Sequence, residues 1–115
     1  MTKVGFSKTD LAKSLNPVLP IRERIESVCM FLERKNVCAL WIALDFMDFD
    51  RFVTDRLKKE ISKSTHLAFE HIHILTTHNH GGGSPDINVL SELVSAGAHE
   101  AIATAQYALM RYSST

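Results

Sequence analysis

The fold is constrained most by the stretch Val37-Cys38-Ala39-Leu40-Trp41-Ile42-Ala43-Leu44-Asp45. It is an unbroken apolar run that ends at a carboxylate. A strand covered on one face alternates apolar and polar residues, whereas a strand covered on both faces is apolar throughout. We therefore expect a central strand over Val37–Leu44 that is covered on both faces and ends at Asp45.

The segment before this strand is also β-patterned. Residues Arg24 to Leu32 place apolar side chains on both faces of a strand, and only the polar residues Glu33 to Asn36 separate them from the central strand. So short a polar break predicts a β-hairpin. Nearer the N-terminus, Val4–Phe6 predicts a short edge strand, and the proline-containing stretch Lys13–Pro20 predicts a loop.

A helix and a further strand follow the central strand. Asp48-Phe49-Asp50 offers N-cap side chains for a helix that runs to about Ser62, and Ile72–Leu75 has a strand pattern. The predicted buried stripe of that helix has four-residue spacing: Phe49, Val53, Leu57 and Ile61. Strand, helix and strand in this order predict a βαβ unit with parallel strands and a right-handed crossover.

The last predicted element is a long helix from about Asn88 to Tyr112. One stripe near 3.6 residues per turn contains Leu90, Val94, Gly97, Ala101, Ala105, Ala108 and Tyr112. Its small residues would let the helix lie close against a sheet. The predicted fold class is therefore α/β, in one domain over residues 1–115: a small mixed sheet with a β-hairpin, a right-handed βαβ unit and a long C-terminal helix.

Composition excludes several classes of function. Thirteen basic and thirteen acidic residues cancel, and no basic block appears, so no nucleic-acid partner is expected. No apolar run approaches the roughly 18 residues of a membrane span. The N-terminus has no signal-like apolar region, so the default expectation is cytoplasmic, with the compartment left open. Cys29 and Cys38 flank the hairpin turn and are interpreted as small apolar residues rather than a disulfide framework or a zinc pair.

The candidate chemistry lies in the loop Thr76-Thr77-His78-Asn79-His80-Gly81-Gly82-Gly83. In parallel sheets ligands collect beyond the carboxyl ends of the strands, so this loop and Asp45 should share one rim. Imidazoles are common zinc ligands. We expect one or both of His78 and His80 to bind zinc, with Asp45 as a carboxylate that orients a metal-bound histidine and with Gly81 and Gly82 as space for the substrate.

Other interpretations of the same loop stay open. His78 and His80 also fit solvated loop residues, and Gly81–Gly83 before a helix fits an anion cradle. The chain would then be a non-enzymatic α/β module that binds an anion or a protein partner. A homo-oligomer that completes its site between subunits is a third hypothesis.

The remaining histidines are less promising as ligands. His71 and His73 repeat the His-x-His spacing inside a strand pattern, and we interpret them as partly covered sheet residues. His66 and His99 lie on predicted polar faces and are not assigned a role.

The chain resembles the N-terminal region of the neutral/alkaline non-lysosomal ceramidase family. The opening Val4-Gly5-Phe6-Ser7-Lys8-Thr9-Asp10-Leu11 is similar to that family's first strand, and Ala43-Leu44-Asp45 to the end of its hairpin. Ile72 through Gly82 resembles the family's strand and its Thr-His-Thr-His-Ser-Gly loop, with Asn79 and Gly81 in place of Thr and Ser.

The resemblance implies a zinc amidase that cleaves the N-acyl bond of ceramide into sphingosine and a fatty acid. It implies that His78 is a zinc ligand and that His80 helps to hold the substrate or its developing oxyanion. The family's other ligands, a His, a Glu and a Tyr, lie farther along its chain than residue 115. The expected function is thus a zinc-dependent hydrolase of an N-acyl amide or lipid, with an incomplete site here and the remaining ligands supplied by a longer chain or a partner.

Overall fold

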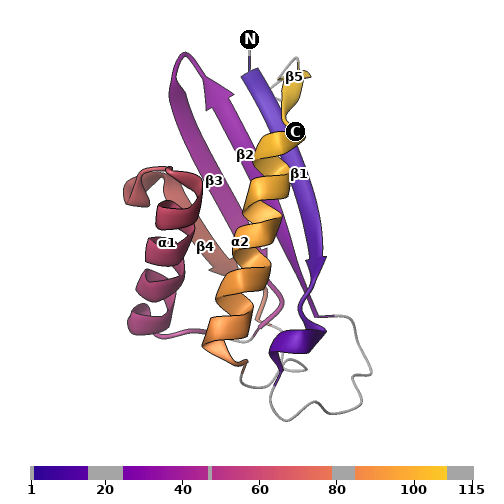
Figure 1. Ribbon diagram of the computed structural model, residues 1–115, viewed down its shortest axis with the longest axis vertical. Coiled ribbons are helices and arrows are strands. Elements are labelled where there is room, and N and C mark those ends of the chain that lie inside the picture. Colours follow the sequence, from indigo (N-terminus) through magenta and orange to yellow (C-terminus); the bar gives the residue numbers. More distant parts are fainter. Residues whose placement is uncertain (1, 16–24, 47, 79–84, 109–115) are drawn as a thin grey trace, which may run out of the picture.

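The computed structural model describes residues 2–15, 25–46, 48–78 and 85–108. The elements in chain order are β1 (Thr2–Asp10), η1 (Ala12–Ser14), β2 (Glu26–Arg34), β3 (Val37–Leu44), α1 (Arg51–Thr65), η2 (Phe69–His71), β4 (Ile72–Thr76), α2 (Ile87–Ala103) and β5 (Gln106–Ala108). The five strands form one mixed sheet in the order β4-β3-β2-β1-β5, and α1 and α2 lie on the same face of it (Figure 1). The predicted α/β class, with a hairpin, a βαβ unit and a later helix, is confirmed.

The hairpin joins β2 and β3 through a two-residue turn. Lys35 and Asn36 both have positive φ angles, of 49° and 64°, and Arg34 pairs with Val37 across the turn. Two left-handed central residues define the turn type whose twist matches that of paired strands. The predicted polar break therefore contains the turn, although β2 extends through Glu33 and Arg34 before reaching it.

Strand β3 is central in the sheet, but helices cover only one of its faces. Leu40, Ile42 and Leu44 have no exposed surface, whereas Val37 on the opposite face is 63% exposed. Trp41 on that opposite face is partly exposed. The prediction that both faces of this strand are covered is therefore wrong for the described residues, because both helices pack on the same side.

Helix α1 follows β3 and begins where it was predicted. The Asp50 carboxylate accepts a hydrogen bond from the Val53 amide at 3.0 Å and so caps the first turn. Leu57 and Ile61 are completely buried against the sheet. The helix ends at Thr65 rather than near Ser62. The next residue, His66, adopts the left-handed conformation that terminates many helices.

Helix α2 packs very closely on β1, as its stripe of small residues predicted. A Cβ atom at Gly5 would lie 1.7 Å from the Ala101 carbonyl oxygen, so only glycine fits there. The Ser7 hydroxyl donates a hydrogen bond to the Gly97 carbonyl oxygen at 2.6 Å. These contacts fix the helix across the sheet at the level of β1 and β2.

The end of α2 differs from the prediction of a helix to Tyr112. The helix stops at Ala103, where the Thr104 hydroxyl donates to the Glu100 carbonyl oxygen at 2.8 Å. Gln106–Ala108 then forms β5, which pairs with β1. Pairing satisfies backbone groups that β1 would otherwise expose at a sheet edge, and this gain outweighs the helical pattern. Residues 109–112 lie outside the described residues.

The first strand is therefore neither short nor at an edge, contrary to the prediction for Val4–Phe6. It spans Thr2–Asp10 and lies between β2 and β5. The polar residues of this strand interrupt the apolar pattern that predicts a strand. One of them, Ser7, is nevertheless buried, because its hydroxyl donates a hydrogen bond to α2 rather than to solvent.

Candidate functional site

The carboxyl ends of β3 and β4 form one rim of the sheet. The two strands are parallel, with Leu44 beside Thr76, so the residues that follow them are neighbours. Asp45 follows β3, and Thr77 and His78 follow β4. The start of α2 and the short helix η1 lie at this same end of the molecule (Figure 1). The predicted meeting of Asp45 with the chain that carries His78 is thus present.

Asp45 ties three strands together at this rim. One carboxylate oxygen accepts from the Glu26 amide at 3.0 Å, and the other accepts from the Thr77 hydroxyl at 3.0 Å. The Thr77 amide in turn donates to the Leu44 carbonyl oxygen at 3.0 Å. Asp45 therefore contacts the loop at Thr77, the residue next to His78. The sequence placed Thr77 in the rim loop without assigning it a role, and it gave no sign of the contact between Asp45 and the Glu26 amide.

His78 leaves the rim in a strained conformation. Its φ angle is 63°, in the left-handed region that non-glycine residues seldom adopt, and its side chain is exposed. The backbone therefore turns sharply directly after the anchored Thr77. The other predicted residues of the loop, His80, Gly81 and Gly82, lie outside the described residues.

The far end of the loop is also anchored. Pro85 forms a β-bridge with Leu15, and the Asp86 amide donates to the Ser14 carbonyl oxygen. The Asp86 carboxylate caps α2 by accepting from the amides of Asn88 and Val89 at 2.9 and 3.1 Å. A carboxylate that already occupies two helix N-terminal amides disfavours a second anion there, which weakens the anion-cradle interpretation.

The other histidines lie apart from this rim. His71 belongs to η2 rather than to a strand, so it does not share a strand face with His73, as the spacing had suggested. His73 is exposed and stacks on Trp41 with ring centroids 5.3 Å apart. His99 shares a 2.6 Å hydrogen bond with the Ser64 hydroxyl, and His66 caps α1.

Both cysteines are free and lie on the helix-covered side of the sheet. Cys29 is completely buried, and burial raises the pKa of its thiol. Cys38 is partly exposed and donates to a Glu33 carboxylate oxygen at 3.4 Å. Burial, this hydrogen bond and the carboxylate charge together raise the pKa of the Cys38 thiol. Cys29 fits the predicted role of a small buried residue, and Cys38 fits it only in part.

The described residues do not complete a zinc site. Within ranges 2–15, 25–46, 48–78 and 85–108, no group of three or more His, Cys, Asp or Glu side chains is arranged to hold a metal ion. His78 has an imidazole, which is a common zinc ligand, but a catalytic zinc usually has three protein ligands. Among the described elements, no helix is long and apolar enough to cross a membrane.

Comparison with known proteins gives a similarity of fold to a solved structure. No protein-family model matches the sequence, and no curated protein sequence matches it. Among solved structures, the chain is similar to the crystal structure of neutral ceramidase from Pseudomonas aeruginosa, with a TM-score of 0.69 and 17% sequence identity. The similarity covers 91% of this chain and 22% of the ceramidase chain, so this chain spans about a fifth of that enzyme. The protein therefore has a ceramidase-like fold.

Proposed function

We propose that this chain is the part of a zinc-dependent, ceramidase-like hydrolase of N-acyl amides that contributes His78 as a zinc ligand. The observation that carries the proposal is the hydrogen bond from Thr77 to Asp45, which anchors the chain immediately before His78. This anchor lies at the carboxyl ends of two parallel strands, where ligands of such sheets collect. The ceramidase-like fold supports an N-acyl amide of a lipid as the substrate class.

Each residue has a distinct role in this proposal. His78 provides an imidazole to zinc, and Asp45 positions it through Thr77. His80 donates a hydrogen bond to the amide oxygen of the substrate, and Gly81 and Gly82 leave space for the acyl group. When bound, zinc would supply Lewis acidity and a more acidic water. The remaining ligands belong outside the described residues, in a longer chain or a partner.

The test compares two exposed histidines with the same backbone conformation. His78 and His66 both have φ angles of 63°, so asparagine, which tolerates that region, suits both positions. The variants are compared in the longer chain or complex that supplies the remaining ligands. There we expect His78→Asn to lower zinc-dependent release of fatty acid from an N-acyl amide by at least about tenfold, because one ligand is lost. His66→Asn should leave the rate unchanged.

The zinc content of the wild-type protein, His78→Asn and His66→Asn is measured in parallel. Loss of both zinc and rate in His78→Asn alone supports the proposal. Equal rates and equal zinc content in all three proteins would refute the assignment. Zinc bound through His78 without amide hydrolysis would retain the metal ligand and reject the hydrolase.

A further inference from the structure

One face of the sheet has no helix on it among the described residues. This open face consists of the even-numbered residues of β1 and β2 and the odd-numbered residues of β3 and β4. Both α1 and α2 lie on the opposite face (Figure 1). A sheet face that stays in water normally carries polar side chains, so its composition is informative.

The open face is apolar rather than polar. Six large hydrophobic side chains are exposed among the described residues, and four of them lie here: Phe6 (59% exposed), Val28 (40%), Val37 (63%) and Leu75 (57%). Contiguous exposed apolar surface of this kind marks an interaction site. The apolar run of β3 has the same meaning, because such strands are usually covered on both faces.

Strand register arranges this surface in rows. Across the sheet, the rows are Lys8–Val28–Ala43–Leu75, Phe6–Met30–Trp41–His73 and Val4–Leu32–Ala39. Beyond the first row lies an acidic pair, Asp10 and Glu26, and beyond the last lies Arg34. The face therefore carries the Asp10 and Glu26 carboxylates at one end with Lys8 in the adjoining row, aromatic side chains in the middle and Arg34 at the other end.

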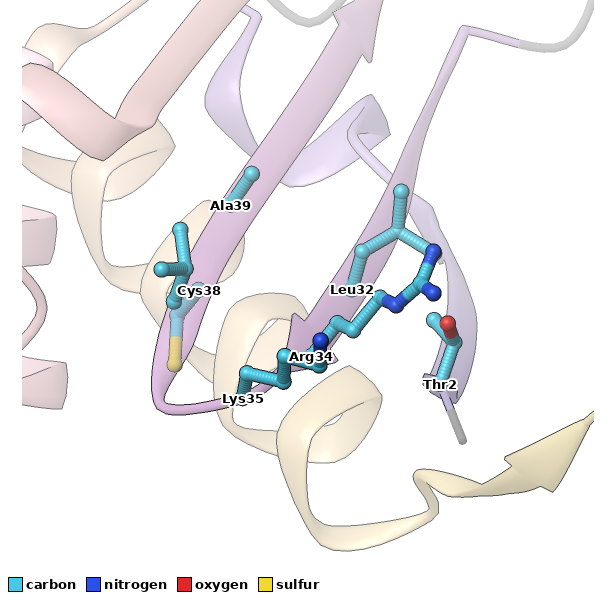
Figure 2. A pocket seen from close by; sticks show the side chains of 7 residues that line it. Thr2, Leu32, Arg34, Lys35, Cys38 and Ala39 are labelled. Atoms are coloured by element: carbon cyan, nitrogen blue, oxygen red, sulfur yellow. The ribbon is translucent and has the colours of Figure 1, made fainter.

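The basic end is hollowed. A recess of about 490 Å³ lies beside the hairpin, with Leu32, Val37 and Ala39 among its lining residues. Figure 2 shows the Arg34 side chain extending from β2 beside Leu32 toward Thr2 of β1. A cation here thus borders an apolar depression and is available to a partner that carries a carboxylate.

We propose that the open face binds the open face of a second copy of this chain, so that the protein is a twofold-symmetric dimer. An axis along the Phe6–Trp41 row would place each strand over its own copy in reverse. The aromatic row would then stack on itself, and Arg34 of one copy would meet Glu26 of the other. Such self-complementarity is what an isologous interface requires.

The area of the face is sufficient for this partner. Four strands about 4.8 Å apart and on average about 26 Å long give roughly 500 Å² for each copy. Two copies would bury about 1,000 Å², near the lower bound for a specific interface, so we expect a micromolar dimer. Packing of two sheets about 10 Å apart is an established arrangement.

Sedimentation equilibrium of the full chain at about 100 µM tests the dimer, since a dissociation constant near 10 µM gives mostly dimer there. Arg34→Glu and Glu26→Arg should each weaken the dimer by about tenfold, because like charges then meet. The double variant should restore it, since the charges are exchanged. A monomeric wild-type chain, or a double variant no tighter than the single ones, would overturn the proposal.

A matched pair of phenylalanines checks the location. Phe6→Glu alters the open face, whereas Phe52→Glu alters α1 at a side chain that is 87% exposed. Circular dichroism should show both variants folded, because both side chains start mostly exposed. We expect only Phe6→Glu to be monomeric. A dimer that survives Phe6→Glu would contradict this interface. The dimer does not involve His78, so His78→Asn should remain dimeric whether or not the proposed function holds.

Discussion

The two faces of the sheet are both lined by apolar side chains, yet helices cover only one of them. On the covered face, α2 approaches β1 so closely that Gly5 cannot carry a Cβ atom. On the open face, Phe6, the next residue along the same strand, is 59% exposed. Neighbouring residues of one strand thus meet opposite surroundings. An apolar strand pattern therefore indicates that both faces of a strand are to be buried, but it does not indicate whether the same chain or another molecule buries them.

The covered face should break most easily at its closest contact. Gly5→Ala forces a methyl group against the Ala101 carbonyl oxygen, which belongs to rigid helix backbone. We expect a loss of about 3 kcal/mol in the free energy of unfolding, at the upper end for overpacking. Urea denaturation measures it.

Gly97→Ala is the matched control for that substitution. Its added methyl group would meet the Thr9 hydroxyl at 2.7 Å, and a side chain can rotate away where a backbone cannot. Alanine also favours the helix by about 1 kcal/mol, so this variant should stay near wild-type stability. Equal losses at the two glycines would show that α2 does not lie closest at Gly5.

Substitution of Asp45 tests the hydrogen bonds at the rim, where β3 and β4 end. Asp45→Ala removes acceptors for the Glu26 amide and the Thr77 hydroxyl, and we expect a loss of about 2 kcal/mol. Thr77→Val removes only one of these bonds, so about half that loss is expected. The two variants and their combination form a double-mutant cycle, and strictly additive losses would argue against the Asp45–Thr77 bond.

The last comparison is between the two thiols on the covered face, which differ in burial, and its expected effect is the smallest. Cys38 should react with iodoacetamide in the native protein, whereas the fully buried Cys29 should react only after unfolding. The Glu33 carboxylate raises the pKa of the Cys38 thiol and so lowers its thiolate fraction at pH 8. Glu33→Gln should therefore speed alkylation about twofold to fivefold. The alkylation rate of Cys38 is followed by mass spectrometry. An unchanged rate would show that Glu33 does not raise the pKa of this thiol.

Much of the fold could be predicted because its signals are local. Three features can be recognised from a few consecutive residues: the Lys35–Asn36 turn, the Asp50 cap and the apolar run of β3. Parallel pairing of β3 and β4 then brought Asp45 to the end of β4 from more than thirty residues away. That step needed only a general rule of sheet topology.

The errors arose where a distant partner decides the local structure. Gln106–Ala108 continues a helical pattern of small residues, but the free edge of β1 draws it into the sheet. Ser7 looks polar, but α2 accepts its hydrogen bond. The role of Thr77 depends on the Asp45 side chain opposite it, which no spacing along the chain reveals.

The assignment of His78 as a zinc ligand is tested by titrating the chain with zinc while long-range ¹H–¹⁵N correlations of its six histidine rings are recorded. Every imidazole is observed at once, so the four rings outside the loop serve as internal controls. We expect the His78 ring nitrogens to shift at the lowest zinc concentration and His78→Asn to abolish the first binding event. Zinc that binds first at His71, His73, His66 or His99, or a first binding event that survives His78→Asn, would contradict this assignment.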